Sequence, residues 1–304
     1  MTTSTFENAP VWLITGSSQG LGKALLDAVL ASGQRAVATL RRPEVLADYQ
    51  ERYSPDQLLI TRLDVSDGDR IVAVFQEVKG HFGRLDVVVN NAGYGIESEI
   101  ETTPDDEARK LFEVLFWGLV NVSKQALSFM RDVNPRGVGG RILNISSITG
   151  YSANPVIGFY SAAKFAVEGF TESFNKEMLP EWDIKAIIIE PGGFRTEWGK
   201  SSMVTTPVAP QYAAPGTPSS IFRSVLHNPP IGDPAKAAQV MLRIVKERDP
   251  PLRLQLGSEC VVIVREKAKR TIQDNEKWED IGHSTNLDGY EKEKVLEHFK
   301  DINF

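Results

Sequence analysis

The fold is decided by the stretch Val11-Trp12-Leu13-Ile14-Thr15-Gly16-Ser17-Ser18-Gln19-Gly20-Leu21-Gly22. A short apolar run, typical of a buried strand, leads into a turn with three glycines, and a helical pattern follows at once. Glycines at this spacing permit a tight turn and a close backbone approach to a pyrophosphate, which the positive end of the helix favours. A plain strand–helix connection is the alternative interpretation. We expect a dinucleotide-binding turn made by Gly16, Ser17, Ser18, Gly20, Leu21 and Gly22.

Outward from this turn, short apolar runs alternate with helical patterns as far as residue 190. Further strands are expected at 36–40, 58–63, 85–89, 141–146 and 184–190. Helices are expected after Pro43, after a cap at Ser66, and over 104–130 and 158–179. The strands are continuously apolar, which is typical of parallel strands buried on both faces. The sequence therefore predicts an α/β protein, a three-layer, doubly wound Rossmann fold with a mostly parallel sheet.

The regular pattern breaks after Glu190, and seven of the 17 prolines lie between Pro207 and Pro234. So long an irregular stretch is typical of a functional lid or of disorder, and we place a lid at about 197–232. A helix at 235–247, a strand at 252–256 and a helix near 261–272 follow. We expect one Rossmann-fold domain over 1–264, lid included.

The last segment, 265–304, is predicted to be a charged C-terminal extension, since it holds 18 of the 74 charged residues. It starts as a charged helix. Its large apolar residues are candidate anchors that would pack on the body of the protein or across a subunit interface: Trp278, Ile281, Leu287 and Tyr290.

Composition excludes several classes of function. The chain has 304 residues and a net charge of −6, which argues against a nucleic-acid binder with a broad cationic surface. Apolar runs are of strand length, so no membrane span is expected, and the N-terminus lacks a secretory pattern. A single cysteine fits a reducing compartment, and the scattered histidines give no metal site. We therefore expect a cytoplasmic protein without a metal.

A pair of residues with proton chemistry lies in the second long helical pattern, in Tyr160-Ser161-Ala162-Ala163-Lys164. Positions i and i+4 share a helix face, so the phenol and the ammonium lie close together. A nearby cation favours the phenolate and lowers the tyrosine pKa, which suits a group that exchanges protons near neutral pH. Taken alone, the pair is more often a surface tyrosine beside a solvated lysine. A serine at the end of the fifth strand, Ser147, can donate to a substrate carbonyl.

Together, TGSSQGLG, NNAG at 90–93, NISS at 144–147, YSAAK at 160–164 and PGG at 191–193 strongly resemble the short-chain dehydrogenase/reductase family. The resemblance covers about residues 10–265, and a weaker match of the tail is to the C-terminal extension of one oxidoreductase branch. It implies that Tyr160 is the general acid/base, that Ser147 orients the carbonyl, and that Lys164 binds the nicotinamide ribose and lowers the Tyr160 pKa. It further implies cofactor contacts from Asn91, Ala92, Gly93, Asp64, Val65, Pro191, Gly192 and Thr196.

One position departs from the family pattern. The family usually places an asparagine 24 residues after Asn91, where it kinks the helix and anchors a water chain to the lysine. Leu115 stands there in this sequence. Either the proton relay takes another route, or the enzyme is slower, or its reaction differs from simple redox. A non-redox lyase or isomerase and a non-catalytic nucleotide-binding protein therefore remain alternatives to an NADPH-dependent carbonyl reductase or alcohol dehydrogenase.

The end of the second strand bears on the choice of cofactor. It reads Thr39-Leu40-Arg41-Arg42, with no acidic residue before Glu44. An acid there would bind the ribose 2′-hydroxyl of NAD, whereas arginine accommodates the 2′-phosphate of NADP. We expect NADP(H), with Arg41 as the phosphate partner, aided by Arg42 or Ser17. A solvated basic turn is the alternative.

Apolar side chains gather in the predicted lid and on loops at the same sheet edge, and they fit an apolar or polycyclic ketone. These residues are Trp198, Met203, Tyr212, Ile221, Phe222 and Leu226 in the lid, and Tyr94, Tyr151, Asn154, Pro155 and Phe194 on the loops. They would equally serve to pack the lid down. The two long helical patterns are apolar, and the resemblance implies that they form a four-helix interface. We expect a homodimer or homotetramer; the alternative is that they only cover the sheet.

Overall fold

A seven-stranded sheet forms the centre of the protein. The computed structural model describes residues 6, 8–289, 294, 295 and 297. The sheet has the order β3-β2-β1-β4-β6-β7-β9, and every neighbouring pair is parallel. Its strands are β1 (Val11–Thr15), β2 (Arg35–Leu40), β3 (Leu58–Arg62), β4 (Val87–Asn90), β6 (Gly140–Ile145), β7 (Ile184–Pro191) and β9 (Arg253–Leu256). The predicted doubly wound α/β fold is confirmed.

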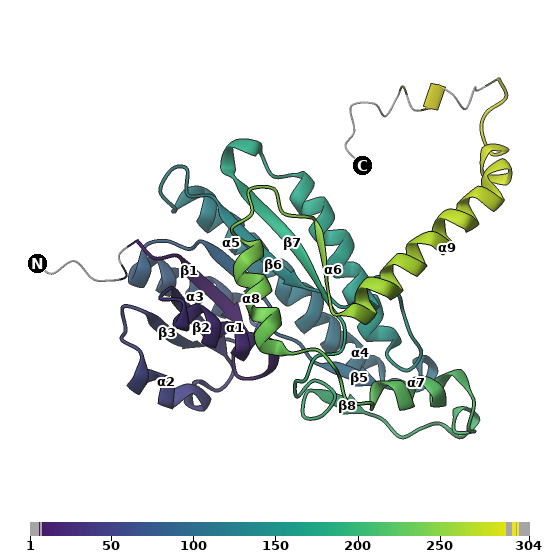
Figure 1. Ribbon diagram of the computed structural model, residues 1–304, viewed down its shortest axis with the longest axis horizontal. Helices are drawn as coiled ribbons and strands as arrows, with labels where there is room; N and C mark the ends of the chain where they lie inside the picture. The colour runs from purple at the N-terminus through teal and green to yellow at the C-terminus, as the bar shows by residue number, and fades with distance from the viewer. Residues whose placement is uncertain (1–5, 7, 290–293, 296, 298–304) are drawn as a thin grey trace, which may run out of the picture. The chain divides into compact units, whose positions relative to one another are not determined.

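Helices cover both faces of the sheet (Figure 1). One face packs against α1 (Gly20–Ala31), α2 (Ala47–Arg52) and α8 (Pro234–Ile244). The other packs against α3 (Gly68–Phe82), α5 (Leu119–Asp132) and α6 (Gly158–Lys176). Strands β1 and β2 are buried along their whole length, as their mostly apolar sequences predict. This three-layer packing brings the carboxyl ends of the strands to one edge, where the site lies.

Two local expectations differ from the structure. The cap of α3 is Asp67, whose Oδ1 accepts a hydrogen bond of 2.9 Å from the backbone N–H of Arg70. Ser66 instead donates its hydroxyl to the Asp64 carboxylate at 2.8 Å, so its prediction as the cap is wrong. The expected helix over 104–130 is interrupted: α4 (Asp105–Phe112) and α5 are joined by a π-helical turn, Glu113–Gly118.

The predicted lid is ordered and begins after β7. It contains β8 (Met203–Thr205) and α7 (Pro218–Leu226), and β8 pairs in parallel with β5 (Gly95–Glu97). The lid also touches the glycine-rich turn, because the Gln19 Nε2 donates to the Ser202 Oγ at 2.6 Å. Backbone pairing and side-chain contacts therefore both attach the lid to the body beside the strand ends.

The chain forms two compact units, residues 1–261 and 262–304. Helix α9 (Ser258–His283) begins in the first. In the second unit, Trp278, Ile281 and Leu287 each expose more than half of their surface, and Tyr290 lies outside the described residues. That these residues act as anchors remains a prediction. Within the part of the chain that the structure describes, no helix combines the length and apolar character needed to cross a membrane.

Candidate active site

The glycine-rich turn after β1 is packed so tightly that larger residues do not fit. Gly16 has a φ of +68°, and a Cβ there would lie 2.9 Å from the Cα of Ala92. A Cβ on Gly22 would lie 2.4 Å from both the carbonyl oxygen of Gly16 and the Nδ2 of Asn91. The glycines therefore allow the turn to lie against the strand end after β4 and to start α1 beside it. This geometry fits a dinucleotide pyrophosphate, which approaches backbone N–H groups at a helix start.

Asn91 ties the two central strands together at this edge. Its Nδ2 donates to the carbonyl oxygens of Thr15 and Gly16, at 2.9 and 3.1 Å. The Thr15 Oγ1 accepts hydrogen bonds from the backbone N–H groups of Asn91 and Ala92, at 2.9 and 3.0 Å. This network holds the segment from Asn91 to Gly93 beside the glycine-rich turn.

The residues expected at the adenine end occupy different environments. Arg41 and its neighbour Arg42 are exposed just after β2. Ser17 is fully buried, and its hydroxyl lies 2.8 and 3.1 Å from the carbonyl oxygens of Ile14 and Thr39, to which it donates. The Ser17 side chain therefore serves the fold, and the two arginines are the groups available for a 2′-phosphate. Val65 is buried in the loop that follows β3.

Thr196, which is expected at the nicotinamide end, lies against the glycine-rich turn. A Cβ built on Gly20 would be 3.3 Å from the Cβ of Thr196. The backbone N–H of Gly192 donates to the carbonyl oxygen of Leu256 at 2.8 Å. The next N–H, of Gly193, donates to the Glu259 Oε1 at 2.8 Å. The loop after β7 is therefore held by Leu256 and Glu259 on one side, and its Thr196 packs against the glycine-rich turn on the other.

The three expected catalytic residues meet where β6 ends and α6 begins. Ser147 follows β6 and caps a short 3₁₀ turn. Tyr160 and Lys164 lie one turn apart on α6, and the Lys164 Nζ is 5.6 Å from the centroid of the Tyr160 ring. The ammonium donates to the carbonyl oxygen of Ile145 at 2.7 Å. All three side chains are buried, so this constellation forms a site shielded from water.

Burial dominates the proton chemistry of the pair. It raises the pKa of Tyr160 to about 12, and the Ser147 hydroxyl opposes this shift. Burial also lowers the pKa of Lys164 to about 8, so the lysine is easily discharged. The lowered Tyr160 pKa expected from sequence is therefore not found in this arrangement. The physical reason is that the phenol is shielded from water, which disfavours its charged form. The Trp198 ring contributes to this burial, since its centroid lies 5.2 Å from that of the Tyr160 ring.

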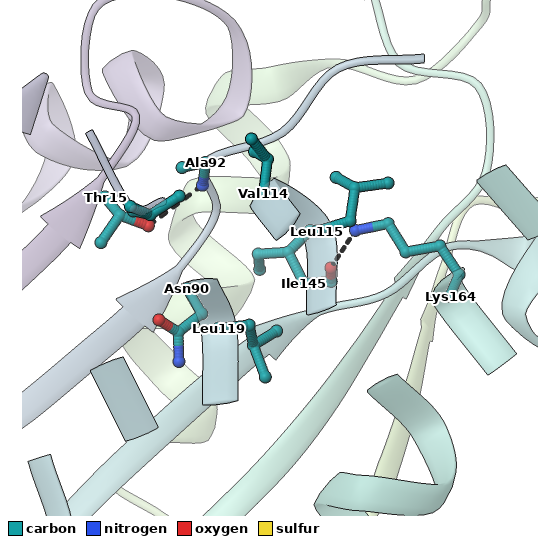
Figure 2. Close-up of a pocket in the computed structure, with 9 residues that line it drawn as sticks. Thr15, Asn90, Ala92, Val114, Leu115, Leu119, Ile145 and Lys164 are labelled. Atoms are coloured by element: carbon teal, nitrogen blue, oxygen red, sulfur yellow. Dashed lines mark hydrogen bonds between the residues drawn. The ribbon is translucent and has the colours of Figure 1, made fainter. Parts of the chain in front are cut away.

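Leu115 lies in the π-helical turn and is buried beside this pair. A Cβ on Gly93 would be 2.7 Å from the Leu115 Cδ2, so the leucine packs directly on the loop after β4. A cavity of about 10 Å³, near the threshold for one water, lies between Leu115 and Lys164 (Figure 2). Thr15, Asn90 and Lys164 give it polar walls, and the rest of its lining is mostly aliphatic, from Val65, Val114, Leu115, Leu119 and Ile145.

An apolar cluster surrounds Tyr160 and includes part of the lid. Its buried members are Ile96, Leu111, Leu115, Val156, Ile157 and Ala163, and the lid adds Trp198, Phe222 and Leu226. Met203 lies over Gly95, where a Cβ would meet its sulfur at 2.7 Å. Two of the expected pocket residues lie elsewhere: Ile221 is 56% exposed, and Phe194 packs on the other face of the sheet.

Two charged groups around the site were not expected from sequence. Glu97 and Glu99 are buried, and Arg223 of the lid binds both, at 3.1 and 2.7 Å. We call these three residues the lid clasp.

The second charged group lies near Lys164, where Arg253 pairs with the buried carboxyl groups of Glu168 and Glu190. Only the spacing of Glu168 held a signal, because it follows Lys164 by four residues, about one helical turn. Glu97 ends β5, and Glu99 lies two residues beyond it, before a 3₁₀ turn.

Comparison with known proteins agrees with this geometry. Residues 10–205 match the family model of the short chain dehydrogenases. An uncharacterized oxidoreductase of Schizosaccharomyces pombe is 38% identical over 84% of this chain and 84% of its own length. A 3-ketodihydrosphingosine reductase of Bacteroides thetaiotaomicron is 31% identical over 86% and 93%. A short-chain dehydrogenase structure from Streptomyces avermitilis is 35% identical, covers 92% of this chain and 99% of its own, and has a TM-score of 0.84. The chain is thus an oxidoreductase of the short-chain dehydrogenase family.

Proposed function

We propose that this protein is an NADP(H)-dependent oxidoreductase that interconverts an apolar ketone and the corresponding secondary alcohol. The observation that carries the proposal is the meeting of Ser147, Tyr160 and Lys164 in one buried site beside the glycine-rich turn. A bound nicotinamide dinucleotide supplies or accepts the hydride. The Bacteroides relative, a reductase of a keto compound by its name, supports the reaction class.

Each side chain has a defined task. The Ser147 hydroxyl donates to the carbonyl oxygen and orients it. The Tyr160 hydroxyl gives that oxygen its proton during reduction and takes it back during oxidation. The Lys164 ammonium holds ribose hydroxyls and stabilises the phenolate that Tyr160 becomes after giving up its proton. The surrounding apolar cluster excludes water and offers apolar surface to the rest of the substrate.

Arg41 supports the choice of NADP(H), since it is exposed after β2, where a ribose 2′-phosphate is expected. The direct test compares kcat/KM for NADPH and NADH with a panel of apolar ketones. We expect a clear NADPH preference, and Arg41→Ala should lower kcat/KM for NADPH by about tenfold or more. Arg243→Ala, at a similarly exposed arginine on α8, is the control. Equal kcat/KM for the two nucleotides in the unmodified protein would contradict the proposal.

Leu115 favours one second candidate, a lyase or isomerase on the same scaffold, because it lines the cavity beside Lys164 at the position where the family usually has an asparagine. The same ketone panel distinguishes a redox enzyme from a lyase or isomerase. A redox enzyme changes the NADPH absorbance at a rate that depends on the ketone. A lyase or isomerase converts its substrate while the nucleotide stays in one redox state.

We also propose that the protein is a homo-oligomer. Trp117 in the π-helical turn is 49% exposed and Phe165 on α6 is 45% exposed, which is unusual for aromatic residues of neighbouring helices. Sedimentation velocity at micromolar concentration should give a dimer or tetramer. Trp117→Asp should shift it toward the monomer, whereas a monomeric unmodified protein would refute the proposal.

A further inference from the structure

A buried group of charged side chains lies behind the catalytic lysine. Glu168 on α6 is 5% exposed and Glu190 on β7 is fully buried. Arg253 on β9 binds the Glu168 Oε2 through its Nε at 2.9 Å, and the Glu172 Oε2 through its Nη2 at 2.8 Å. Its Nε is 3.8 Å from the Glu190 Oε1. One arginine therefore faces three carboxyl groups, two of them shielded from water.

Glu168 belongs to both this group and the catalytic site. It follows Lys164 by one helical turn, so the two side chains share a face of α6. A Cβ built on Gly150 would lie 2.4 Å from the Ser146 Oγ, 3.2 Å from the Glu168 Oε1 and 3.2 Å from the Lys164 Cβ. These three residues thus converge on Gly150, so the Glu168 Oε1 lies near Ser146 and the stem of the Lys164 side chain, whereas its Oε2 binds Arg253.

The opposite side of Lys164 offers less support for a charge. There, the small cavity is lined by Leu115, Val114 and Leu119 and by the uncharged side chains of Thr15 and Asn90, which donate to other partners. The ammonium itself donates to the backbone carbonyl of Ile145. A neutral carbonyl stabilises a buried ammonium less than a carboxylate does. The charge on Lys164 therefore depends on the Glu168 side of the site.

The direction of each pKa agrees with this dependence. Burial lowers the pKa of Lys164 to about 8, and the Glu168 charge acts against that shift. Burial first, and then the neighbouring Glu190 charge, raise the pKa of Glu168 to about 7, while Ser146 and Arg253 act in the opposite direction. Glu168 is thus ionised in the pH range in which Lys164 begins to lose its proton.

We propose that Glu168 is a positioning residue for the proton step: its carboxylate keeps the Lys164 ammonium charged in a chain that has Leu115 where the family usually has an asparagine. This rests on the proposed function of Tyr160 and Lys164. A charged Lys164 is what stabilises the Tyr160 phenolate after its proton has gone to the carbonyl oxygen. Glu168 acts only through the lysine and touches neither substrate nor nucleotide.

The other ionisable groups around Glu168 are few. Lys164 and Glu172 face it from its own helix, Glu190 from β7, and Arg253 from β9. The start of α9 contributes Glu259, which is bound to the Gly193 N–H, and Cys260. Burial raises the pKa of the Cys260 thiol to about 12, so it stays neutral in the range concerned. Lys164 is therefore the group whose titration Glu168 controls near pH 8.

The test is the pH profile of Glu168→Gln against Glu172→Gln. Both variants remove a carboxylate that binds Arg253 from the same helix, but only Glu168 lies one turn from Lys164. In ketone reduction with NADPH, the alkaline limb of kcat for Glu168→Gln should move to lower pH by about one unit or more. Glu172→Gln should keep the limb of the unmodified protein. Glu168→Asp, which retains the charge, should bring the limb most of the way back to that of the unmodified protein.

A second measurement needs no turnover. Lys164 is expected to hold the ribose, so NADPH affinity, followed by nucleotide fluorescence, should weaken with rising pH earlier in Glu168→Gln than in Glu172→Gln. If no ketone is reduced, the proposed function fails, but this curve still reports the charge of Lys164. Coincident curves for the two variants in both measurements would overturn the role of Glu168. An equal shift in both would assign the effect to Arg253 and would overturn it as well.

Discussion

The nucleotide side and the substrate side of the site are held together by different kinds of contact. On the nucleotide side, most contacts involve backbone atoms. Gly16 and Gly22 pack against the loop after β4, and the Asn91 side chain donates hydrogen bonds to two backbone carbonyl oxygens. On the substrate side, the Tyr160 cluster and the lid clasp make the contacts through side chains. The first is a geometry that few residues can supply, whereas the second is a surface that many apolar residues could form.

The largest effect is expected from Tyr160→Phe, which leaves the packing of both sides intact and removes only the phenolic hydroxyl. Loss of a general acid lowers kcat by about 10²- to 10⁴-fold. NADPH affinity should change little, because the ring and its packing against Trp198 remain. Steady-state kinetics and nucleotide fluorescence on the same sample measure both. A variant that loses NADPH binding as well would show that the two sides are not separable.

Gly22→Ala tests how strictly the nucleotide side is built. The new Cβ would clash with the Gly16 carbonyl and the Asn91 amide, and overpacking of this kind costs about 1–3 kcal/mol. We expect a lower Tm and NADPH affinity reduced by about tenfold or more. Gly80→Ala is the matched control, a helical glycine in α3 with nothing within 4 Å of its Cβ, and it should be neutral or slightly stabilising. Equal effects at the two sites would contradict the packing argument.

Trp198→Ala tests the packing on the substrate side in the same way. It uncovers Tyr160, and we expect kcat/KM for apolar ketones to fall by about tenfold, about 1.4 kcal/mol, mostly through KM. NADPH affinity should hold. Ile221→Ala, at a lid residue that is 56% exposed, serves as the control and should leave the kinetics unchanged. If Ile221→Ala has the larger effect, the substrate lies on a different face of the lid.

The lid clasp should weaken in acid. Hydrogen bonding to Arg223 is the main cause that holds the pKa of Glu99 below its ordinary value. A lowered pKa in the folded state stabilises the folded form above the unfolded value, and that stability is lost as the pH falls through the folded pKa. We therefore expect hydrogen exchange in α7 to rise below about pH 4, relative to α8, once intrinsic rates are corrected. An unchanged α7-to-α8 ratio from pH 6 to pH 3 would exclude the clasp as a lid anchor.

The smallest effect concerns the cap of α3, on the nucleotide side. Asp67→Ala should destabilise the protein by about 1 kcal/mol, because it removes the acceptor for the Arg70 N–H. Ser66→Ala should cost less, since the Ser66 hydroxyl bonds to Asp64 and not to the helix. Chemical denaturation of both variants compares them. The reverse order would restore Ser66 as the cap.

Sequence alone predicted the strand–turn–helix unit on the nucleotide side and the parallel sheet, because these depend on local patterns. The glycine spacing follows from one tight turn, and the parallel sheet follows from apolar runs such as β1. The cap of α3 was missed by one residue, since Ser66 and Asp67 are both good caps and only the course of the chain after β3 selects between them. The π-helical turn at Leu115 was also missed, because the helix is continuous through it and no residue type marks a π-helical turn in a sequence.

The substrate side was less predictable because it depends on pairings between distant residues. Nothing near Phe194 indicates that it packs across the sheet, or near Ile221 that it faces solvent. The lid clasp joins Arg223 to two carboxylates more than 120 positions earlier in the chain, a distance at which no local pattern applies. Glu168 could have been found, since its spacing from Lys164 is helical, but its burial is set by β7 and β9.

The pairing of β5 with β8 has a consequence for how this protein can change over generations. Backbone hydrogen bonds set the register Gly95↔Met203, Ile96↔Val204 and Glu97↔Thr205, and they depend little on side-chain identity. The stretch between β8 and α7 can therefore accept substitutions and insertions while both of its ends stay in place. New substrate preferences can arise there by drift, with little risk to the nucleotide turn that every variant still needs.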